Sequence, residues 1–399
     1  MATPRRTPER GIETLLAAKE MLVVCGSGGT GKTTVSASLG ALAATQLGAR
    51  VLVLTVDPAR RLATALGLDH SGFGNTERRI DPAALSAAAP PAPGVKQGEL
   101  WMAMLDTKAG WDELIRRHAP DAALRDQVLA NPLYQNITAR FVHSHDYIAM
   151  ERLQELHASG RYDLVIIDTP PSRHALDLLD APGRMKEFFG SRLLRWLTVP
   201  YRSRLFTVAS KPFYQVADRV LGSRFLQDIA EFFVLFQSME RGFVKRAGEV
   251  EHLLVDPRTA FIVVTTLEAA PAHEAHFLAD EIRARKMHLG AVVLNRTLPP
   301  SIRQGGAAKA ARSLIEVADD LALVEEISTR IDAEPVMVGN VLREVGERFH
   351  DIAIVASREA ERRAELEELG TLTVTVPSLA QDVNDLVGLL ELGRHLQET

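Results

Sequence analysis

The sequence predicts an α/β fold with a mostly parallel, doubly wound sheet and an inserted helical subdomain. Short, almost continuously apolar runs rich in β-branched residues alternate with helical patterns, which is typical of parallel strands covered by helices on both faces. A long, mostly helical stretch from residue 131 to residue 248 interrupts this alternation. The predicted strands are Met21–Cys25, Val51–Val56, Trp101–Leu105, Leu164–Asp168, Phe261–Thr265, Ala291–Leu294, Ile352–Ala356 and Leu372–Val376.

The first predicted strand leads into a glycine-rich loop. Residues 26–34 read Gly-Ser-Gly-Gly-Thr-Gly-Lys-Thr-Thr, which fits G-x-x-x-x-G-K-[ST], and a helix is predicted from Lys32 to Gln46. Strand, loop and helix together predict a P-loop NTPase, because backbone N–H groups and the helix N-terminus cradle phosphates. The residues expected to bind a nucleoside triphosphate here are Gly28, Gly29, Thr30, Gly31, Lys32, Thr33 and Thr34. Lys32 also adds a full positive charge for catalysis, and the Thr33 hydroxyl is expected to bind Mg2+.

Two carboxylates follow predicted strands, where ligands of parallel sheets bind. Asp168 closes an apolar strand as a Walker B carboxylate does, and we expect it to support Mg2+; the alternative is a helix-capping aspartate. Asp57 follows Val51–Val56 and can orient or deprotonate an attacking water. A turn aspartate before Pro58 is an equally good interpretation of Asp57 from the residues alone.

The composition limits the function classes. The 399 residues carry a net charge of -5, which argues against general binding of nucleic acid. Cys25 is the only cysteine, so neither an intrachain disulfide nor a cysteine-pair metal site can form within the chain. No uncharged apolar run reaches the roughly 18 residues of a spanning helix, and no signal-peptide core follows the basic N-terminus. We therefore expect no integral membrane segment and a cytoplasmic location.

The chain is expected to form a single ATPase domain over residues 1–399, with no internal repeat. The predicted nucleotide-binding core covers about 15–175 and 255–399, and residues 176–254 form a helical subdomain. Residues 188–243 carry many large apolar side chains, which either pack against neighbouring helices or form an apolar groove for a client segment. Two stretches, 81–98 and 303–309, are expected to be exposed loops.

Several motifs together resemble the family of deviant-P-loop ATPases of the anion-transporting type, which includes arsenite-pump ATPases and the guided-entry factors for tail-anchored proteins. The resemblance covers nearly the whole chain, and its motifs are Gly28-Gly29, Asp57-Pro58-Ala59, Leu105 to Trp111, Asp168 to His174, Asn295 and Val376-Pro377. It implies that ATP and Mg2+ are the cofactors and that Asp57 activates water. It also implies that Asn295 reads the adenine and that Pro377 packs on it.

The resemblance further implies a dimer that ATP closes and hydrolysis opens, with helical subdomains joined into a groove for an apolar protein client. Ser27 departs from the family, whose loop carries a second lysine at this place that reaches the partner's phosphates. Hydrolysis by a homodimer should then be slow, unless Arg60, Arg61 or Arg173 substitutes. The alternative is a catalytically weak ATP-binding subunit of a heterodimer, whose related chain supplies the lysine. The lack of further cysteines argues against arsenite pumping.

Overall fold

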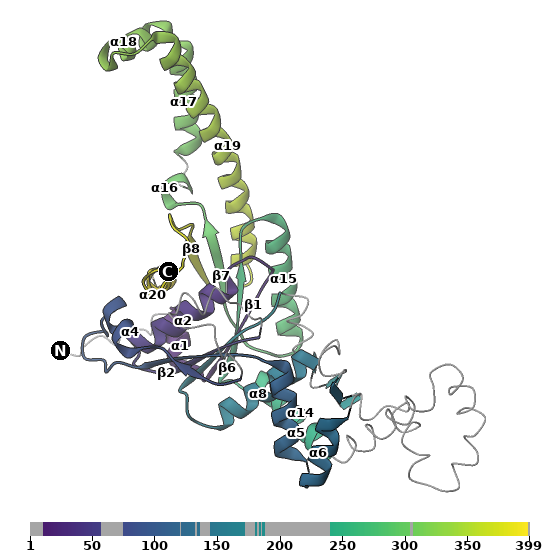
Figure 1. Cartoon of the computed structure of the whole chain (residues 1–399). Coiled ribbons are helices and arrows are strands. Elements are labelled where there is room, and N and C mark those ends of the chain that lie inside the picture. The colour runs from purple at the N-terminus through teal and green to yellow at the C-terminus, as the bar shows by residue number, and fades with distance from the viewer. Residues whose placement is uncertain are drawn as a thin grey trace, which may run out of the picture.

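The structure is a computed structural model, and its description covers residues 11–56, 75–119, 121–131, 134–135, 144–171, 180–181, 183–184, 186–187, 240–303 and 306–397. In this part of the chain one twisted sheet forms the centre of the molecule (Figure 1). Its strand order is β3-β4-β2-β5-β1-β6-β7-β8, and every neighbouring pair is parallel except β3 with β4. The predicted α/β fold with a mostly parallel sheet is confirmed.

Most strands lie where the apolar runs predict them. β1 and β5 have the predicted bounds, and β2, β4, β6, β7 and β8 differ by one to three residues at an end, as termini usually do; the two-residue β3 was not predicted. The bounds are β1 Met21–Cys25, β2 Arg50–Thr55, β3 Arg78–Arg79, β4 Glu99–Met104, β5 Leu164–Asp168, β6 Thr259–Thr265, β7 Leu289–Thr297 and β8 Leu372–Pro377. In β1 alternate side chains enter opposite cores, because successive strand residues point to opposite faces.

Helices cover both faces of the sheet (Figure 1). One apolar core joins the sheet to α1 Ile12–Ala18, α2 Lys32–Gln46, α4 Pro82–Ala88 and α20 Leu386–Gln397. The second core joins the opposite face to α8 Ser144–Ala158, α14 Glu240–Val255 and α15 Ala269–Ala284. Two further helices follow: α5 Thr107–His118 packs beside α8, and α6 Ala122–Ala130 packs against α5. Because β1 lies between β5 and β6 with a core on each side, the loop that follows it starts from the best-buried part of the fold.

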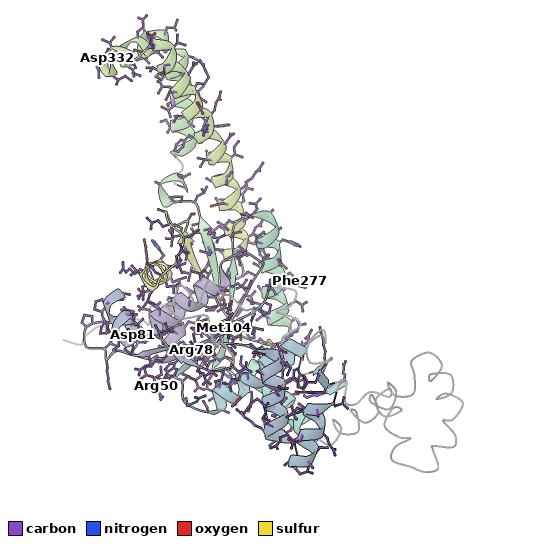
Figure 2. All side chains as sticks on the ribbon, viewed as in Figure 1. Arg50, Arg78, Asp81, Met104, Phe277 and Asp332 are labelled. Atoms are coloured by element: carbon purple, nitrogen blue, oxygen red, sulfur yellow. The ribbon has the colours of Figure 1, made fainter. Side chains whose placement is uncertain are left out.

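A helical arm projects from the sheet between β7 and β8 (Figure 1). It consists of α17 Ala307–Asp319, α18 Leu321–Ile331 and the 33-residue α19 Pro335–Glu367, preceded by the short α16 Pro300–Arg303. At 1.5 Å per residue α19 is about 50 Å long. Asp332, which follows α18, lies at the far end of the arm (Figure 2). Small residues let the two long helices approach closely, since a Cβ on Gly346 would lie 2.7 Å from Ile315 and 3.1 Å from the Ala311 carbonyl.

Three sequence expectations need correction or comment. The strand predicted at Ile352–Ala356 is wrong, because this run lies inside α19. A five-residue apolar run fits either a strand or a helix by length. Here it continues the helix, with Ala356 buried and Ile354 and Val355 exposed. The loop expected over 81–98 contains α4, whose first turn Asp81 caps by accepting a hydrogen bond from Ala83 N. Most of the expected subdomain at 176–254 lies outside the described residues, and its limits stay a prediction.

Candidate nucleotide-binding site

The glycine loop fits against its neighbours only because it lacks side chains. Gly26 has φ of +150°, and a Cβ there would lie 2.0 Å from the Val264 carbonyl oxygen of β6. Gly31, at φ +93°, caps α2, and its Cβ would lie 2.3 Å from Asn295 Nδ2. Backbone conformations with positive φ favour glycine. The glycine pattern of the sequence therefore has a direct cause in the contacts of the loop with β6 and β7.

Hydrogen bonds across the loop hold its curve. The Thr30 hydroxyl and the Lys32 ammonium both donate to the Ser27 carbonyl oxygen, at 2.9 Å each. Lys32 is buried at the first position of α2. A buried ammonium, a helix N-terminus and successive backbone N–H groups form a cradle that favours an anion. The arrangement suits a phosphate group chemically.

A carboxylate and two hydroxyls meet below this cradle. Thr33 Oγ1 donates to Asp168 Oδ2 at 2.6 Å, and Thr55 Oγ1 donates to the same oxygen at 3.0 Å. Asp168 is 1% exposed, at the end of β5, and its Cα pairs in register with both Val24 and Thr55. Hydroxyl and carboxylate oxygens beside a phosphate site are the ligands that Mg2+ prefers. Thr33 and Asp168 therefore fit the predicted metal role.

Asn295 reaches the loop from β7. Its side-chain amide donates to the Thr30 carbonyl oxygen at 2.7 Å, and the residue is buried. Pro377, at the end of β8, pairs with Thr297, two residues further along β7. The structure thus places Asn295 against the glycine loop and Pro377 at the neighbouring strand end. Their proposed contacts with adenine stay a prediction.

A cavity of about 230 Å3 opens beside the loop. Five predicted residues line it, and three further ones join them; the lining is Gly28, Gly29, Gly31, Lys32, Thr33, Thr169, Pro171 and Arg296. Of the other predicted binders, Thr30 turns its hydroxyl into the loop and Thr34 is partly exposed on α2. Asp57 lies outside the described residues, as do Arg60, Arg61 and Arg173, and the role of Asp57 in positioning water stays a prediction.

Sequence comparison assigns the chain to a family. A sequence model of the anion-transporting ATPase family matches residues 19–337, a span that includes the glycine loop, Asp168 and Asn295. The chain belongs to this family. It is thus an ATPase by family, as the resemblance of its motifs predicts. The match ends three residues into α19, so most of that helix, β8 and α20 lie beyond it.

Curated relatives of this ATPase are distant. An uncharacterized protein of Streptomyces coelicolor is 27% identical over 278 residues, which cover 70% of this chain and 62% of that protein. An ATPase ASNA1 homolog of Entamoeba dispar is 23% identical over 298 residues, or 73% of this chain and 81% of the relative. ATPase get3 of Aspergillus terreus is 23% identical over 285 residues, which cover 70% of this chain and 73% of that protein. This chain therefore spans less than two thirds of the Streptomyces protein.

Two site residues of this ATPase, Thr55 and Arg296, were not predicted from its sequence, and a third, Thr169, was named there only as part of the motif Asp168 to His174. Thr55 holds Asp168, and Thr169 donates its hydroxyl to the Val24 carbonyl oxygen at 2.9 Å, joining β5 to β1. Arg296 lines the cavity directly after Asn295. All three lie at the carboxyl ends of strands beside residues that the sequence did single out. Polar side chains at every strand end, rather than only the motif residues, are the signal that would have found them.

Cys25 lies at the end of β1, immediately before the loop. It is 3% exposed, and burial raises the pKa of its thiol to about 12, against a smaller lowering effect of Lys32. A thiol that stays protonated and buried is chemically inert. Cys25 therefore serves as a small buried apolar side chain of β1.

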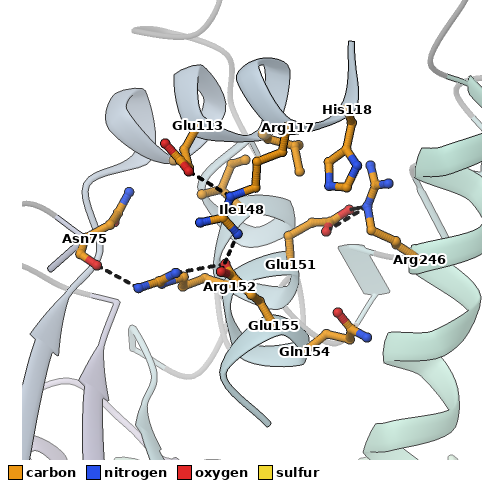
Figure 3. A pocket seen from close by; sticks show the side chains of 12 residues that line it. Asn75, Glu113, Arg117, His118, Ile148, Glu151, Arg152, Gln154, Glu155 and Arg246 are labelled. Atoms are coloured by element: carbon orange, nitrogen blue, oxygen red, sulfur yellow. Dashed lines mark hydrogen bonds and ion pairs between the residues drawn. The ribbon is translucent and has the colours of Figure 1, made fainter. Parts of the chain in front are cut away.

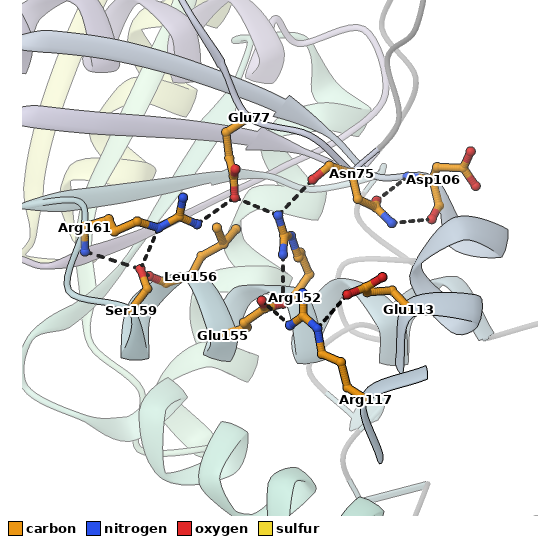
Figure 4. Close-up of polar contacts among 10 residues, drawn as sticks. All are labelled: Asn75, Glu77, Asp106, Glu113, Arg117, Arg152, Glu155, Leu156, Ser159 and Arg161. Atoms are coloured by element: carbon orange, nitrogen blue, oxygen red, sulfur yellow. Dashed lines mark hydrogen bonds and ion pairs between the residues drawn. The ribbon is translucent and has the colours of Figure 1, made fainter. Parts of the chain in front are cut away.

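A second cavity, of about 210 Å3, lies between α5, α8 and α14 (Figure 3). Its charged side chains face one another: Arg246 of α14 donates to Glu151 of α8 at 2.7 Å, and Arg152 contacts Glu155 and Glu77 (Figure 4). Burial and the nearby Arg246 and Arg117 lower the pKa of His118. The ion pair between Arg246 and Glu151 joins α14, which follows the predicted subdomain, to α8 of the core.

Within the described residues we find no group of three or more histidine, cysteine or acidic side chains placed to hold a metal ion. The same part of the chain has no helix that is both long and apolar enough to cross a membrane.

Proposed function

We propose that this chain binds Mg-ATP in the glycine-loop cradle, hydrolyses it, and uses the cycle to open and close a dimer that captures and releases an apolar client. The observation that carries the proposal is the 2.6 Å hydrogen bond between Thr33 and Asp168, directly below the cradle. It brings a metal-binding hydroxyl and a carboxylate together beside the buried Lys32. Family membership supports the ATPase activity.

In the binding step, the backbone N–H groups at residues 28–34 and the Lys32 ammonium would hold the β- and γ-phosphates. Lys32 now donates to the Ser27 carbonyl oxygen, a neutral acceptor. A phosphate oxygen is a stronger acceptor for an ammonium because the hydrogen bond then joins opposite charges. Asn295 and Pro377 would contact the adenine: Asn295 contacts the loop, and Pro377 ends the strand that neighbours β7.

Thr33 and Asp168 would hold Mg2+, which when bound neutralises charge on the phosphates. Thr55 keeps the Asp168 carboxylate in place by a second hydrogen bond. Asp57 would accept a hydrogen bond from the attacking water and take its proton as the water adds to the γ-phosphorus. The bond from that phosphorus to the bridging oxygen of the β-phosphate would break, so that ADP leaves and inorganic phosphate forms. Lys32 would stabilise the charge that collects on the leaving phosphate oxygens.

The partner is either a second copy or a related ATPase chain. The heterodimer alternative, with this chain as a catalytically weak ATP-binding subunit, is favoured by Ser27, which carries no charge. The presence of Lys32 and Asp168 favours an active ATPase instead. The chain has one cysteine, so arsenite pumping through thiolates is not part of the proposal. We place the cycle in the cytoplasm, because a chain with one cysteine needs no oxidising compartment to form disulfides.

ATP hydrolysis by the purified chain tests the enzymatic proposal. We expect Asp57→Asn to lower kcat by about 100-fold or more while ATP binding persists, because a positioned base contributes roughly that factor. Lys32→Ala should weaken ATP binding itself. If the wild type and Asp57→Asn are equally inert while both bind ATP, the catalytically weak subunit is the better description.

The molar mass of the native complex tests the dimer. Light scattering with and without a non-hydrolysable ATP analogue should show a dimer stabilised by nucleotide. Co-purification of a relative with lysine at the position of Ser27 would support the heterodimer. A stable homodimer that hydrolyses ATP would rule the heterodimer out as a requirement.

A further inference from the structure

Arg296 has a left-handed backbone conformation within a strand. Among the described residues, the non-glycine residues with a left-handed backbone are Lys286, Arg296 and Asp332. Lys286 follows the C-cap of α15, and Asp332 is the C-cap of α18, where left-handed residues are common. Arg296, at φ +56°, lies inside β7. Such outliers persist only where the surroundings enforce them, and they concentrate at ligand sites.

A β-bulge and a neighbouring side chain enforce this conformation. Leu294 pairs with Thr375 and Thr297 with Pro377, so β7 contains one residue more than β8 between these pairs. Arg296 N donates to the side-chain oxygen of Asn295 at 3.0 Å. Bulges re-aim a side chain away from the regular alternation of the strand. Here the bulge turns Arg296 toward the glycine loop.

The side chain of Arg296 ends above the cradle. Its Nη1 donates to the Gly29 carbonyl oxygen at 3.2 Å, and the residue lines the same cavity as Lys32 and Thr33. Residues 26–34 contain one cationic side chain, Lys32. Arg296 is therefore the second cation at the cavity among the described residues.

We propose that Arg296 is a phosphate-binding residue that exchanges the Gly29 carbonyl for phosphate oxygens when nucleotide enters. A guanidinium bonds more strongly to phosphate than to a neutral carbonyl, because charge-assisted pairs are shorter and can be bidentate. The strained backbone holds the side chain close to the cradle beforehand. This inference rests on the proposed binding of ATP and deepens it by naming a phosphate contact that lies outside the loop motif.

The test compares the affinities of ATP and of inorganic tripolyphosphate, which has no base or ribose, by displacement of a fluorescent ATP analogue. Arg296→Asn removes the charge while asparagine tolerates the left-handed backbone. We expect both ligands to bind about 10- to 100-fold more weakly, with Arg296→Lys recovering part of the loss. Lys286→Asn is the matched control, because it removes one cation from an equally left-handed position outside the cavity. It should leave both affinities within about twofold.

Each outcome decides one question. Tripolyphosphate affinity unchanged in Arg296→Asn, with ATP binding intact in the wild type and weakened in Lys32→Ala, overturns only the role of Arg296. The same holds if ATP is weakened but tripolyphosphate is not, because the contact is then with the nucleoside. Failure of the wild type to bind ATP overturns the proposed function, and this inference with it. Arg296→Gly provides a second variant whose backbone fits the same conformation.

Discussion

The glycine-loop edge of the sheet and the helical arm show two different ways in which sequence determines structure. At the loop edge, a backbone carbonyl of β6 and the Asn295 side chain of β7 approach the loop glycines so closely that single atoms decide which residue fits. On the arm, two helices contact each other along one side, and large apolar residues on the other sides are exposed, among them Leu321, Val336, Met337 and Val341. The first region is fixed by its surroundings, whereas the second depends mainly on its own two helices.

The two regions also differ in whether their charged side chains are buried or exposed. Asp168 is buried among hydroxyl donors at the loop edge. The end of the arm, residues 319–334, carries six acidic side chains and one arginine, Arg330, all in contact with solvent or with neighbours on the same helix pair. Exposed charges of this kind contribute little to stability. We therefore expect substitutions at the loop edge and in the core to cost far more than similar ones on the arm.

The largest effect is expected for Gly26→Ala. The new Cβ would meet the Val264 carbonyl oxygen at 2.0 Å in a backbone conformation that alanine rarely adopts. We expect more than about 4 kcal/mol of destabilisation, or no folded protein, as measured by urea unfolding. Gly29→Ala in the same loop is the control, since no atom lies within 4 Å of its Cβ; strain alone should cost about 1–2 kcal/mol. Equal effects of the two would contradict the close contact with β6.

The rate at which a thiol reacts with a disulfide reagent can be compared directly between the two regions. At pH 8 a thiol with a pKa of about 12 is ionised in roughly one molecule in ten thousand, so Cys25 should not react with a disulfide reagent in the folded protein. A cysteine introduced by Val341→Cys on the exposed face of α19 should react at least about a thousand times faster. In urea both thiols should react at similar, fast rates, because unfolding exposes them equally to the reagent. Fast labelling of Cys25 in the native protein would show that β1 opens readily.

Removing Arg246 from the core is expected to cost about 3 kcal/mol. Its guanidinium and the Glu151 carboxylate are 13% and 8% exposed, and deleting one member of a buried pair leaves the other charge poorly compensated. Arg246→Met, measured by urea unfolding, should be partly rescued by adding Glu151→Met. The arm supplies the control: Arg330→Met breaks an exposed pair with Glu326 and should cost less than about 0.5 kcal/mol. Similar costs for the two would remove the distinction between the regions.

Gly346→Ala is expected to disturb the arm by about 1–2 kcal/mol without reaching the sheet. The added methyl meets Ile315 of α17 at 2.7 Å, so the helices must separate or shift. Hydrogen exchange should quicken in α17 and α19 and stay unchanged in β1 and β5, because local units open independently. Gly306→Ala, whose Cβ would meet nothing within 4 Å, is the matched variant. Faster exchange throughout the sheet would show that the arm and core unfold together.

The smallest effect is expected for Leu321→Ser on α18. The side chain is 79% exposed, so stability should change by less than about 0.5 kcal/mol. Leu39→Ser in α2, at 0% exposure, should cost several kcal/mol. Thermal unfolding of both variants provides the comparison. A large loss for Leu321→Ser would mean that another surface covers this part of the arm in solution.

The bounds of helices and strands were predicted best where the sequence pattern is local. β1, β5 and α2 have the predicted bounds, because an apolar run bounded by polar residues or a helix opened by a glycine loop needs few neighbours to be recognised. The five-residue run Ile352–Ala356 was predicted as a strand and is helical, since its length fits either state. The arm was not foreseen, and its glycines at 339 and 346 have meaning only opposite Ala318 and Ala311.

The sequence by itself determined the glycine loop, the lysine and the strand-end carboxylate, because their spacing and residue types are dictated by phosphate and metal chemistry. Only the tertiary structure decided which groups meet. Asp168 lies 135 residues from Thr33 and reaches it because the register pairs Val24 with Asp168 in adjacent strands. Arg296 reaches Gly29 because one extra residue in β7 turns its side chain toward the loop. Register and bulges belong to pairs of strands, and no single segment of the chain contains them.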